Sequence, residues 1–353
     1  MLELTEYLEK AVKSNASDVF IVAGSPVCQK LDKRVCPINK EDMLYPQDAE
    51  QLITDLYKSA KRPMDLFLHK GDDDFSFSIG GLARFRVNAY RQRGSLAAVV
   101  RIVAFGIPNW QEIGIPEQVM NLADESHGMI LVTGTAGSGK STTQACIIDR
   151  INNTYERHII TMENPIEYLH RNVKSIVSQR EISIDTEDYL SALRACLRQA
   201  PDVILLGEMR DAETIHTAMT AAETGHLLIA TLHTKGAVNT IDRIVDSFPS
   251  EQQGQIRMQL SMVLRTVVSQ QLLPDINGGL VPAFEVMHMT SGIRGLIRDG
   301  KTHQIDNDIA RGGADGMISM DNSIVGLYKA GKISKETALD YCDNLETVKR
   351  KLN

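Results

Sequence analysis

Residues 129–143 read MILVTGTAGSGKSTT, an apolar run followed by a glycine-rich loop and the start of a helix-forming stretch. Residues 134–141 match the pattern GxxxxGK[ST]. In this pattern the glycines let the backbone turn tightly, so that its N–H groups face phosphate oxygens. Residues 129–133 predict a strand and residues 141–152 predict a helix, which is the context that the motif requires. The stretch therefore predicts a P-loop domain.

The side chains of this loop suit ATP and Mg²⁺. Lys140 is expected to bring a positive charge to the β and γ phosphates, and the Ser141 hydroxyl is a hard oxygen ligand for Mg²⁺. A glycine-rich turn without a ligand is the alternative, but the flanking strand and helix favour nucleotide binding. The predicted nucleotide-binding residues of the loop are Gly134, Thr135, Ala136, Gly137, Ser138, Gly139, Lys140, Ser141 and Thr142.

Two further apolar runs end in carboxylates. Residues 203–208, VILLGE, predict a buried strand that ends at Glu208, in the Walker B position of a Mg²⁺ ligand. Residues 159–163, IITME, predict another strand, which ends at Glu163. For a single acid at a strand end, a helix cap or a solvated charge is the alternative. Ligands of open parallel sheets bind beyond the carboxyl ends of the strands, so Gly134, Glu163 and Glu208 are expected to converge on one crevice.

Two histidines, His226 and His233, flank the apolar run 227–231. A single histidine is usually structural. The pair around a third buried strand favours a role in nucleotide binding and in sensing the γ phosphate, so we count His226 with the nucleotide-binding residues and His233 with the catalytic residues.

The segment 118–353 alternates strands and helices, which predicts βαβ units around a largely parallel sheet. After residue 250 the chain is predicted to be mainly helical, with a possible hairpin around residues 277–279. The predicted strands are 129–133, 158–162, 203–206 and 227–231, and the predicted helices are 141–152, 188–199 and 212–224.

The segment 1–105 has a different pattern of apolar and polar residues. Apolar and polar residues alternate after the acidic loop 72–74, which predicts antiparallel strands. With two predicted helices, 2–13 and 47–59, this part is a small α+β domain. Residues 106–117, GIPNWQEIGIPE, carry two prolines and are interpreted as a linker. The predicted class of the whole chain is α/β.

Composition limits the function. The chain has 353 residues with 43% hydrophobic residues, typical of a globular protein, and a net charge of -7, which disfavours nucleic acid as partner. Its five cysteines form no CxxC pair, which disfavours a zinc cluster. The N-terminus lacks a signal-peptide core, and no run approaches the roughly 18 apolar residues of a membrane span. We therefore expect a cytoplasmic protein without direct membrane insertion.

Together these stretches resemble the secretion ATPases of the PilT/GspE type. The resemblance rests on stretches similar to the family's Walker A, Asp box, Walker B and His box, in this order: GTAGSGKSTT (134–143), ITMENPIEYLH (160–170), PDVILLGEMRD (201–211) and TAAETGHLLIATLHT (220–234). Two later stretches, GIRGLIRDGKTHQI (292–305) and GMISMDNSI (316–324), are similar to motifs of the pilus-retraction branch. Segments 15–24 and 84–103 also resemble the family's N-terminal domain, so the resemblance covers essentially the whole chain.

The resemblance implies an N-terminal PAS-like domain and a C-terminal RecA-like ATPase domain. It implies a homohexamer at the base of a type IV pilus, at the cytoplasmic face of the membrane, on an inner-membrane platform protein. Glu163 would be the catalytic acid that orients water, and Glu208 the Walker B acid. Arginines of the N-terminal domain would complete the site; Arg101 and Arg93 are preferred over Arg86 and Arg91.

The sequence departs from the family pattern at several positions. Asn164 stands where the family commonly has Asp, which removes one negative charge near the metal. Gly292 and Gly295 replace Ala and Asn, and glycine costs a helix about 1 kcal/mol relative to alanine. We therefore expect a looser helix over this segment.

Pilus retraction, as in twitching motility, is the preferred function, and three alternatives stay open. A pilus-assembly or type II secretion ATPase is disfavoured by the absence of a tetracysteine zinc site. A nucleic-acid motor is disfavoured by the net charge of -7. A non-hydrolysing nucleotide-binding regulator is disfavoured by the intact Lys140, Ser141, Glu163 and Glu208.

Overall fold

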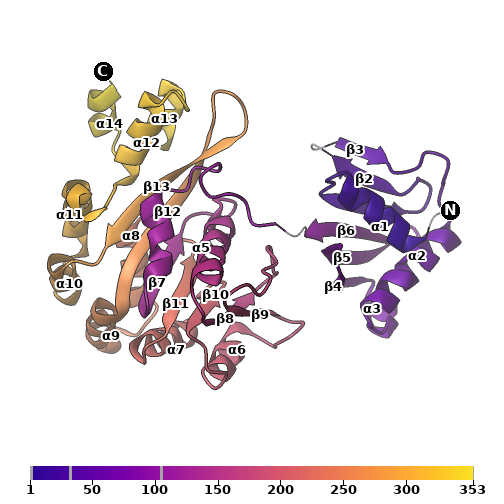
Figure 1. The fold of residues 1–353 in the computed structure, drawn as a ribbon, viewed down its shortest axis with the longest axis horizontal. Coiled ribbons are helices and arrows are strands. Elements are labelled where there is room, and N and C mark those ends of the chain that lie inside the picture. The colour runs from indigo at the N-terminus through magenta and orange to yellow at the C-terminus, as the bar shows by residue number, and fades with distance from the viewer. Residues whose placement is uncertain (1–2, 32–33, 104–105, 353) are drawn as a thin grey trace. The chain divides into compact units, whose positions relative to one another are not determined.

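The computed structural model describes residues 3–31, 34–103 and 106–352. The chain divides into two compact units. The first comprises Met1–Gly106 and the short segment Glu167–Leu169, and the second comprises Ile107–Ile166 and His170–Asn353. Each unit has its own hydrophobic core. Figure 1 shows the helices and strands of each unit.

The first unit is a sheet with helices packed on it. Its described strands form a six-stranded antiparallel sheet in the order β3-β2-β1-β6-β5-β4. Strand β5 alternates buried Ala83, Phe85 and Val87 with less buried arginines, so one face of the sheet joins the core. Its elements are α1 (Leu4–Lys13), β1 (Asp18–Val22), β2 (Cys28–Leu31), β3 (Arg34–Pro37), α2 (Pro46–Ser59), α3 (Asp65–Lys70), β4 (Asp72–Ile79), β5 (Ala83–Gln92) and β6 (Ser95–Val103).

The second unit is a largely parallel sheet. Within the described residues it has seven strands in the order β13-β12-β7-β11-β10-β8-β9, and only β13 runs antiparallel to its neighbour. The strands are β7 (Gly128–Thr133), β8 (His158–Glu163), β9 (Ile176–Glu181), β10 (Val203–Leu206), β11 (Leu227–Leu232), β12 (Leu264–Pro274) and β13 (Leu280–His288).

Helices cover both faces of this sheet. Strand β7 is wholly buried: Met129 and Leu131 pack in a cluster with α6 to α10, whereas Ile130 and Val132 pack in a cluster with α4 and α5. The helices after β13 lie along one side of the unit, from α10 beside α9 to α12 against β13 (Figure 1). The helices are α4 (Glu117–Met120), α5 (Lys140–Thr154), α6 (Tyr189–Cys196), α7 (Ala212–Glu223), α8 (Ala237–Asp246), α9 (Ser250–Val263), α10 (Ser291–Arg298), α11 (Ile305–Arg311), α12 (Met320–Lys329), α13 (Lys335–Tyr341) and α14 (Leu345–Leu352).

The predicted class, α/β with an antiparallel N-terminal sheet before a largely parallel one, is confirmed. The prediction of a mainly helical chain after residue 250 was wrong for residues 264–288, where β12 and β13 form a long hairpin around the expected turn. Their apolar runs lack strict alternation because β12 is buried between β7 and β13. Strand β9, which carries few apolar residues, was not predicted either.

The predicted linker, residues 106–117, is part of the second unit from Ile107 onward. Ile107, Trp110 and Ile113 pack against the cluster that covers α5. Over the described ranges of the chain, no helix is both long and apolar enough to cross a membrane.

Candidate nucleotide site

The glycine-rich loop joins the buried strand β7 to helix α5. Gly134, Gly137 and Gly139 have φ angles of 139°, 75° and 88°, in the region that favours glycine. A side chain at Gly134 would overlap the main-chain oxygen of Gln270, so this position also requires glycine for space. The loop therefore has a conformation that most other sequences could not adopt.

Lys140 begins α5 and is buried. Its Nζ donates to the carbonyl oxygens of Gly134 and Thr135, at 2.8 and 2.9 Å. These bonds hold the lysine ammonium against the loop whose N–H groups are predicted to bind phosphate. Ser141 and Thr142 follow in the first turn and are half-buried.

Two hydroxyl groups in and beside the loop fit a polar ligand. The buried Thr133 Oγ1 and Ser138 Oγ have no hydrogen-bond partner among the described residues. Buried polar atoms are rarely left unsatisfied, and those that are call for an explanation such as a bound ligand or water. The loop residues therefore fit a phosphate-bearing ligand, whose oxygens would accept from these hydroxyls.

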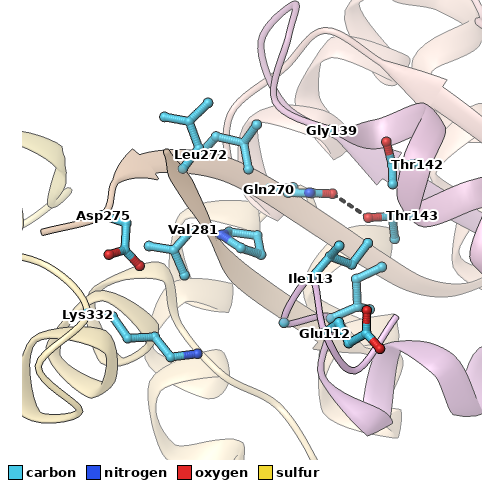
Figure 2. A pocket seen from close by; sticks show the side chains of 14 residues that line it. Glu112, Ile113, Gly139, Thr142, Thr143, Gln270, Leu272, Asp275, Val281 and Lys332 are labelled. Carbon is cyan, nitrogen blue, oxygen red and sulfur yellow. Dashed lines mark hydrogen bonds between the residues drawn. The ribbon is translucent and has the colours of Figure 1, made fainter. Parts of the chain in front are cut away.

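A recess of about 380 Å³ lies beside the loop and is lined entirely by residues of the second unit (Figure 2). Thr142, Thr143 and Gly139 form its α5 side, and β12 and β13 form the opposite side. Its size lies within the range of small-molecule sites. The remaining lining residues are mostly apolar, with charges at Glu112, Asp275 and Lys332.

Glu163 is the last residue of β8. Its carboxylate accepts hydrogen bonds from Thr161 Oγ1 at 2.6 Å and from Gln179 Nε2 at 3.2 Å. These donors fix the orientation of the carboxylate. The peptide bond from Asn164 to Pro165, immediately after the strand, is cis.

Glu208 follows β10 after one glycine, and its side chain is 13% exposed. Its carboxylate pairs with the Arg210 guanidinium at 2.5 Å, and its other oxygen lies 3.6 Å from His233 Nε2. His233 follows β11 directly. The structure therefore brings the predicted Walker B acid and His233 together.

The site residues share one edge of the sheet. Strands β7, β11, β10 and β8 are parallel neighbours, and Leu206 at the end of β10 pairs with Ala230 and Met162, within two residues of the ends of β11 and β8. Gly134, His233, Glu208 and Glu163 lie at or just beyond the carboxyl ends of these strands. The loops are also joined there: Gly207 donates its N–H to the Met162 oxygen at 2.8 Å. The fold thus places these residues at one edge of the sheet, and their convergence on one crevice stays a prediction.

His226 lies elsewhere. It precedes β11 and therefore lies at the amino end of that strand, about 20 Å from His233 at 3.3 Å per residue. Its Nδ1 lies 2.9 Å from the oxygen of Ala221, and its N–H also donates to that oxygen. Within one chain, the hydrogen bonds of His226 connect the end of α7 to the start of β11. His226 therefore does not lie with His233 at the carboxyl edge of the sheet.

Arg101 and Arg93 belong to the first unit. The Arg101 side chain is 65% exposed, and its Nε donates to the buried Asp18 at 3.1 Å. Arg93 lies in the turn between β5 and β6 with a φ of 46°, beside Gly94 with a φ of 80°. Two successive positive φ angles are typical of a tight hairpin turn, which presents the Arg93 side chain to the exterior.

Tyr189, at the start of α6, was not predicted as a site residue. A side chain on Gly207 would lie 2.7 Å from the Tyr189 hydroxyl, so this hydroxyl lies against the loop between β10 and Glu208. Burial raises the pKa of Tyr189, and the negative charges of Glu208 and Glu163 raise it further. In the sequence Tyr189 lies more than fifteen residues from both carboxylates, and no motif links it to either. Only the fold reveals that it lies near them.

Comparison with known proteins places the chain in a family. Residues 2–278 match the family described as type II/IV secretion system protein. The chain belongs to this family. It is 44% identical over 338 residues to the type IV pilus retraction ATPase PilT of Pseudomonas aeruginosa, covering 96% of this chain and 97% of that protein. It is 37% identical to the type IV pilus ATPase PilU of the same organism, covering 97% of this chain and 89% of that one.

A solved structure of this family has the same fold. The crystal structure of the pilus retraction motor PilT with bound ADP matches with a TM-score of 0.90 at 42% identity. The match covers 99% of this chain and 100% of that chain. The resemblance to PilT-type ATPases that the motifs indicated is therefore confirmed.

Proposed function

We propose that the chain is an ATP-hydrolysing motor that drives retraction of a type IV pilus. The observation that carries the proposal is the arrangement at one sheet edge: a phosphate loop with Lys140, and two carboxylates at the ends of adjacent strands. The named relatives support the choice of pilus retraction within the family. ATP is the substrate, and Mg²⁺ the implied cofactor.

The residues divide the work of phosphoryl transfer. Loop N–H groups and Lys140 would bind the β and γ phosphates. Ser141 and Glu208 would hold Mg²⁺, which when bound neutralises charge that develops on the phosphates. Over the described residues no group of three or more His, Cys, Asp or Glu is arranged as a metal site, so the nucleotide itself would supply further ligands.

Glu163 would orient the attacking water, because Thr161 and Gln179 hold its carboxylate at a fixed angle. His233, beside Glu208, would respond to the γ phosphate. Arg101 and Arg93 would stabilise the transferred charge from the first unit. An arginine that arrives from another body couples hydrolysis to domain movement.

The proposal extends to the assembly. The active form would be a homohexamer on the cytoplasmic face of the membrane, bound to an inner-membrane platform protein. The predicted domains, a PAS-like domain over 1–105, a linker over 106–117 and a RecA-like domain over 118–353, stay predictions. So do the absence of nucleic-acid partners and of direct membrane insertion.

The test is ATP hydrolysis by the purified chain with Mg²⁺, with its mass in solution and with Lys140→Ala beside it. We expect turnover that depends on Lys140, in a six-subunit particle, and pilus retraction in cells that depends on the same residue. A monomer that binds ATP without hydrolysing it would replace the motor with a regulatory nucleotide-binding protein. Turnover with loss of pilus extension, rather than retraction, in cells that lack the protein would favour an assembly ATPase.

A further inference from the structure

Gln270 is a buried polar residue that no motif of the sequence includes. It lies on β12, and its side chain is 3% exposed. Strand β12 runs parallel to β7, and Ser269 pairs with Thr133 at the end of that strand. Gln270 is therefore beside the first residue of the phosphate loop.

Three contacts bind Gln270 to this loop and its helix. Its main-chain oxygen lies where a side chain on Gly134 would be. Its side-chain nitrogen lies 2.8 Å from where a side chain on Gly139 would be. Its Oε1 accepts a hydrogen bond from Thr143 Oγ1, at 2.8 Å, between two buried groups (Figure 2).

The bond from Thr143 fixes the orientation of the amide. Because the hydroxyl donates to Oε1, the Nε2 group points away from Thr143, against Gly139. No described residue accepts a hydrogen bond from Nε2. Gln270, Gly139 and Thr142 all line the recess beside the loop. Nε2 is not among the enclosed side-chain atoms of the described residues that lack a partner, so it is open to the recess, where a bound ligand can take the place of solvent as its acceptor.

The position of Nε2 identifies the acceptor. Nε2 lies against Gly139, the residue before α5. The N–H groups of the loop bind the β and γ phosphates of a nucleotide. The part of the nucleotide that enters the recess is therefore the part on the other side of the β phosphate. Its acceptors at this depth are the oxygens of the α phosphate and the ribose.

We propose that Gln270 binds the nucleotide directly: Thr143 holds its amide, and Nε2 donates to an oxygen of the α phosphate–ribose part. This inference rests on the proposed function, because it requires a nucleotide in the loop. It goes beyond the P-loop motif by adding a binding residue from β12.

Calorimetric titration of the full chain with MgADP tests the inference, with Gln270→Met and Gln270→Glu as variants. Methionine keeps the volume without the donor, and glutamate keeps the acceptor for Thr143 without the donor. Gln271→Met is the matched control, because adjacent strand residues face opposite sides of a sheet. We expect both Gln270 variants to bind ADP about tenfold more weakly, and the control to bind within about twofold of the wild type.

Titration with inorganic pyrophosphate distinguishes a direct hydrogen bond from Gln270 to the nucleotide from support of the loop conformation by Gln270. Pyrophosphate fills the loop without ribose or α phosphate, so its affinity should change less than that of ADP in Gln270→Met. Equal losses for both probes would overturn the inference, because Gln270 would then only support the loop. Unchanged ADP binding in either folded variant, judged by its melting temperature, would overturn it too. A wild-type chain that does not bind ADP would instead refute the proposed function itself.

Discussion

At the scale of single residues, the two carboxylates of the crevice have different surroundings. Glu163 accepts hydrogen bonds from two neutral donors, Thr161 and Gln179. Glu208 pairs with the Arg210 guanidinium. The donors Thr161 and Gln179 orient the Glu163 carboxylate at the end of β8, as a residue that positions water requires, whereas the guanidinium beside Glu208 suits a fixed electrostatic role. This difference supports Glu163 as the base and Glu208 as the metal-side acid.

Replacement of Glu163 by glutamine tests this assignment. The variant should bind ATP like the wild type, because the phosphate loop is unchanged. Its turnover should fall by at least about 100-fold, the usual contribution of a positioned general base. The measurement is steady-state hydrolysis together with ATP titration. Glu156→Gln, at an exposed position before the same strand, is the control, and unchanged turnover in Glu163→Gln would refute the role of the base.

At the scale of elements, Glu285 joins two helices to the sheet. It lies on β13, is 6% exposed, and accepts the Ala237 N–H at 2.8 Å at the start of α8. The Met320 N–H, at the start of α12, also donates a hydrogen bond to this carboxylate. Burial raises the pKa of Glu285 to about 7, although these N–H groups lower it.

This carboxyl makes stability depend on pH. Its pKa is higher in the folded chain than the ordinary 4.5, so the folded state binds more protons between these two values. The stability that Glu285 contributes therefore falls as pH rises from about 4.5 through about 7, by about 3 kcal/mol in total.

Glu285→Gln, which cannot ionise, should remove this dependence. The difference in melting temperature between this variant and the wild type, measured by circular dichroism, should be more positive at pH 8 than at pH 5. Glu251→Gln, at an exposed position of α9, should show no such difference. An equal shift of the Glu285→Gln melting temperature at both pH values would contradict the prediction.

Helix α10 allows a test of the glycines in the retraction-type segment. An added side chain at Gly295 would meet no atom within 4 Å, and Gly295 lies inside the helix. Gly295→Ala should therefore stabilise the chain by about 0.5–1 kcal/mol, as measured by chemical denaturation.

The end of the same helix provides the opposite case. Gly300 has a φ of 69°, and its N–H donates to the Ile297 oxygen at the helix end. Gly300→Ala should destabilise the chain by about 1 kcal/mol, because alanine disfavours this conformation. If Gly295→Ala is also destabilising, the glycine serves a contact outside the single chain.

At the scale of the whole molecule, the proposed mechanism needs two bodies. The carboxylates lie in the second unit, and Arg101 lies in the first. If the arginine acts on the site of a neighbouring subunit, a ring can combine two inactive variants into active sites. The inactive pair is Glu163→Gln with Arg101→Gln, and the glutamine at 101 keeps a donor for the buried Asp18.

Mixed rings of these two variants should regain hydrolysis that neither variant has alone. Independent sites in a ring of equal mixture would recover up to about one quarter of wild-type turnover. The measurement is hydrolysis after the subunits are mixed and reassembled. Mixtures that stay inactive, with rings of normal mass, would show that Arg101 does not act between subunits.

Local patterns in the amino-acid sequence were enough to predict the class of fold, which is confirmed, and to propose most of the site. The loop glycines, the apolar strands and the acids that end them are local patterns, and parallel strands with their loops at one edge bring such residues together whatever the details of packing. Local patterns alone therefore predicted that Glu163, Glu208 and the loop that carries Lys140 lie at one edge of the sheet.

The tertiary structure decided what depends on neighbours distant in the chain. Buried β12 has no strict alternation, and its position between β7 and β13 gives Gln270 its contact with the loop. His226 and His233 are equivalent in sequence, yet strand direction puts them at opposite edges of the sheet. Local pattern sets which element forms, and only the packing of elements sets which side chains meet, because those contacts join residues more than a hundred positions apart, such as Thr143 and Gln270.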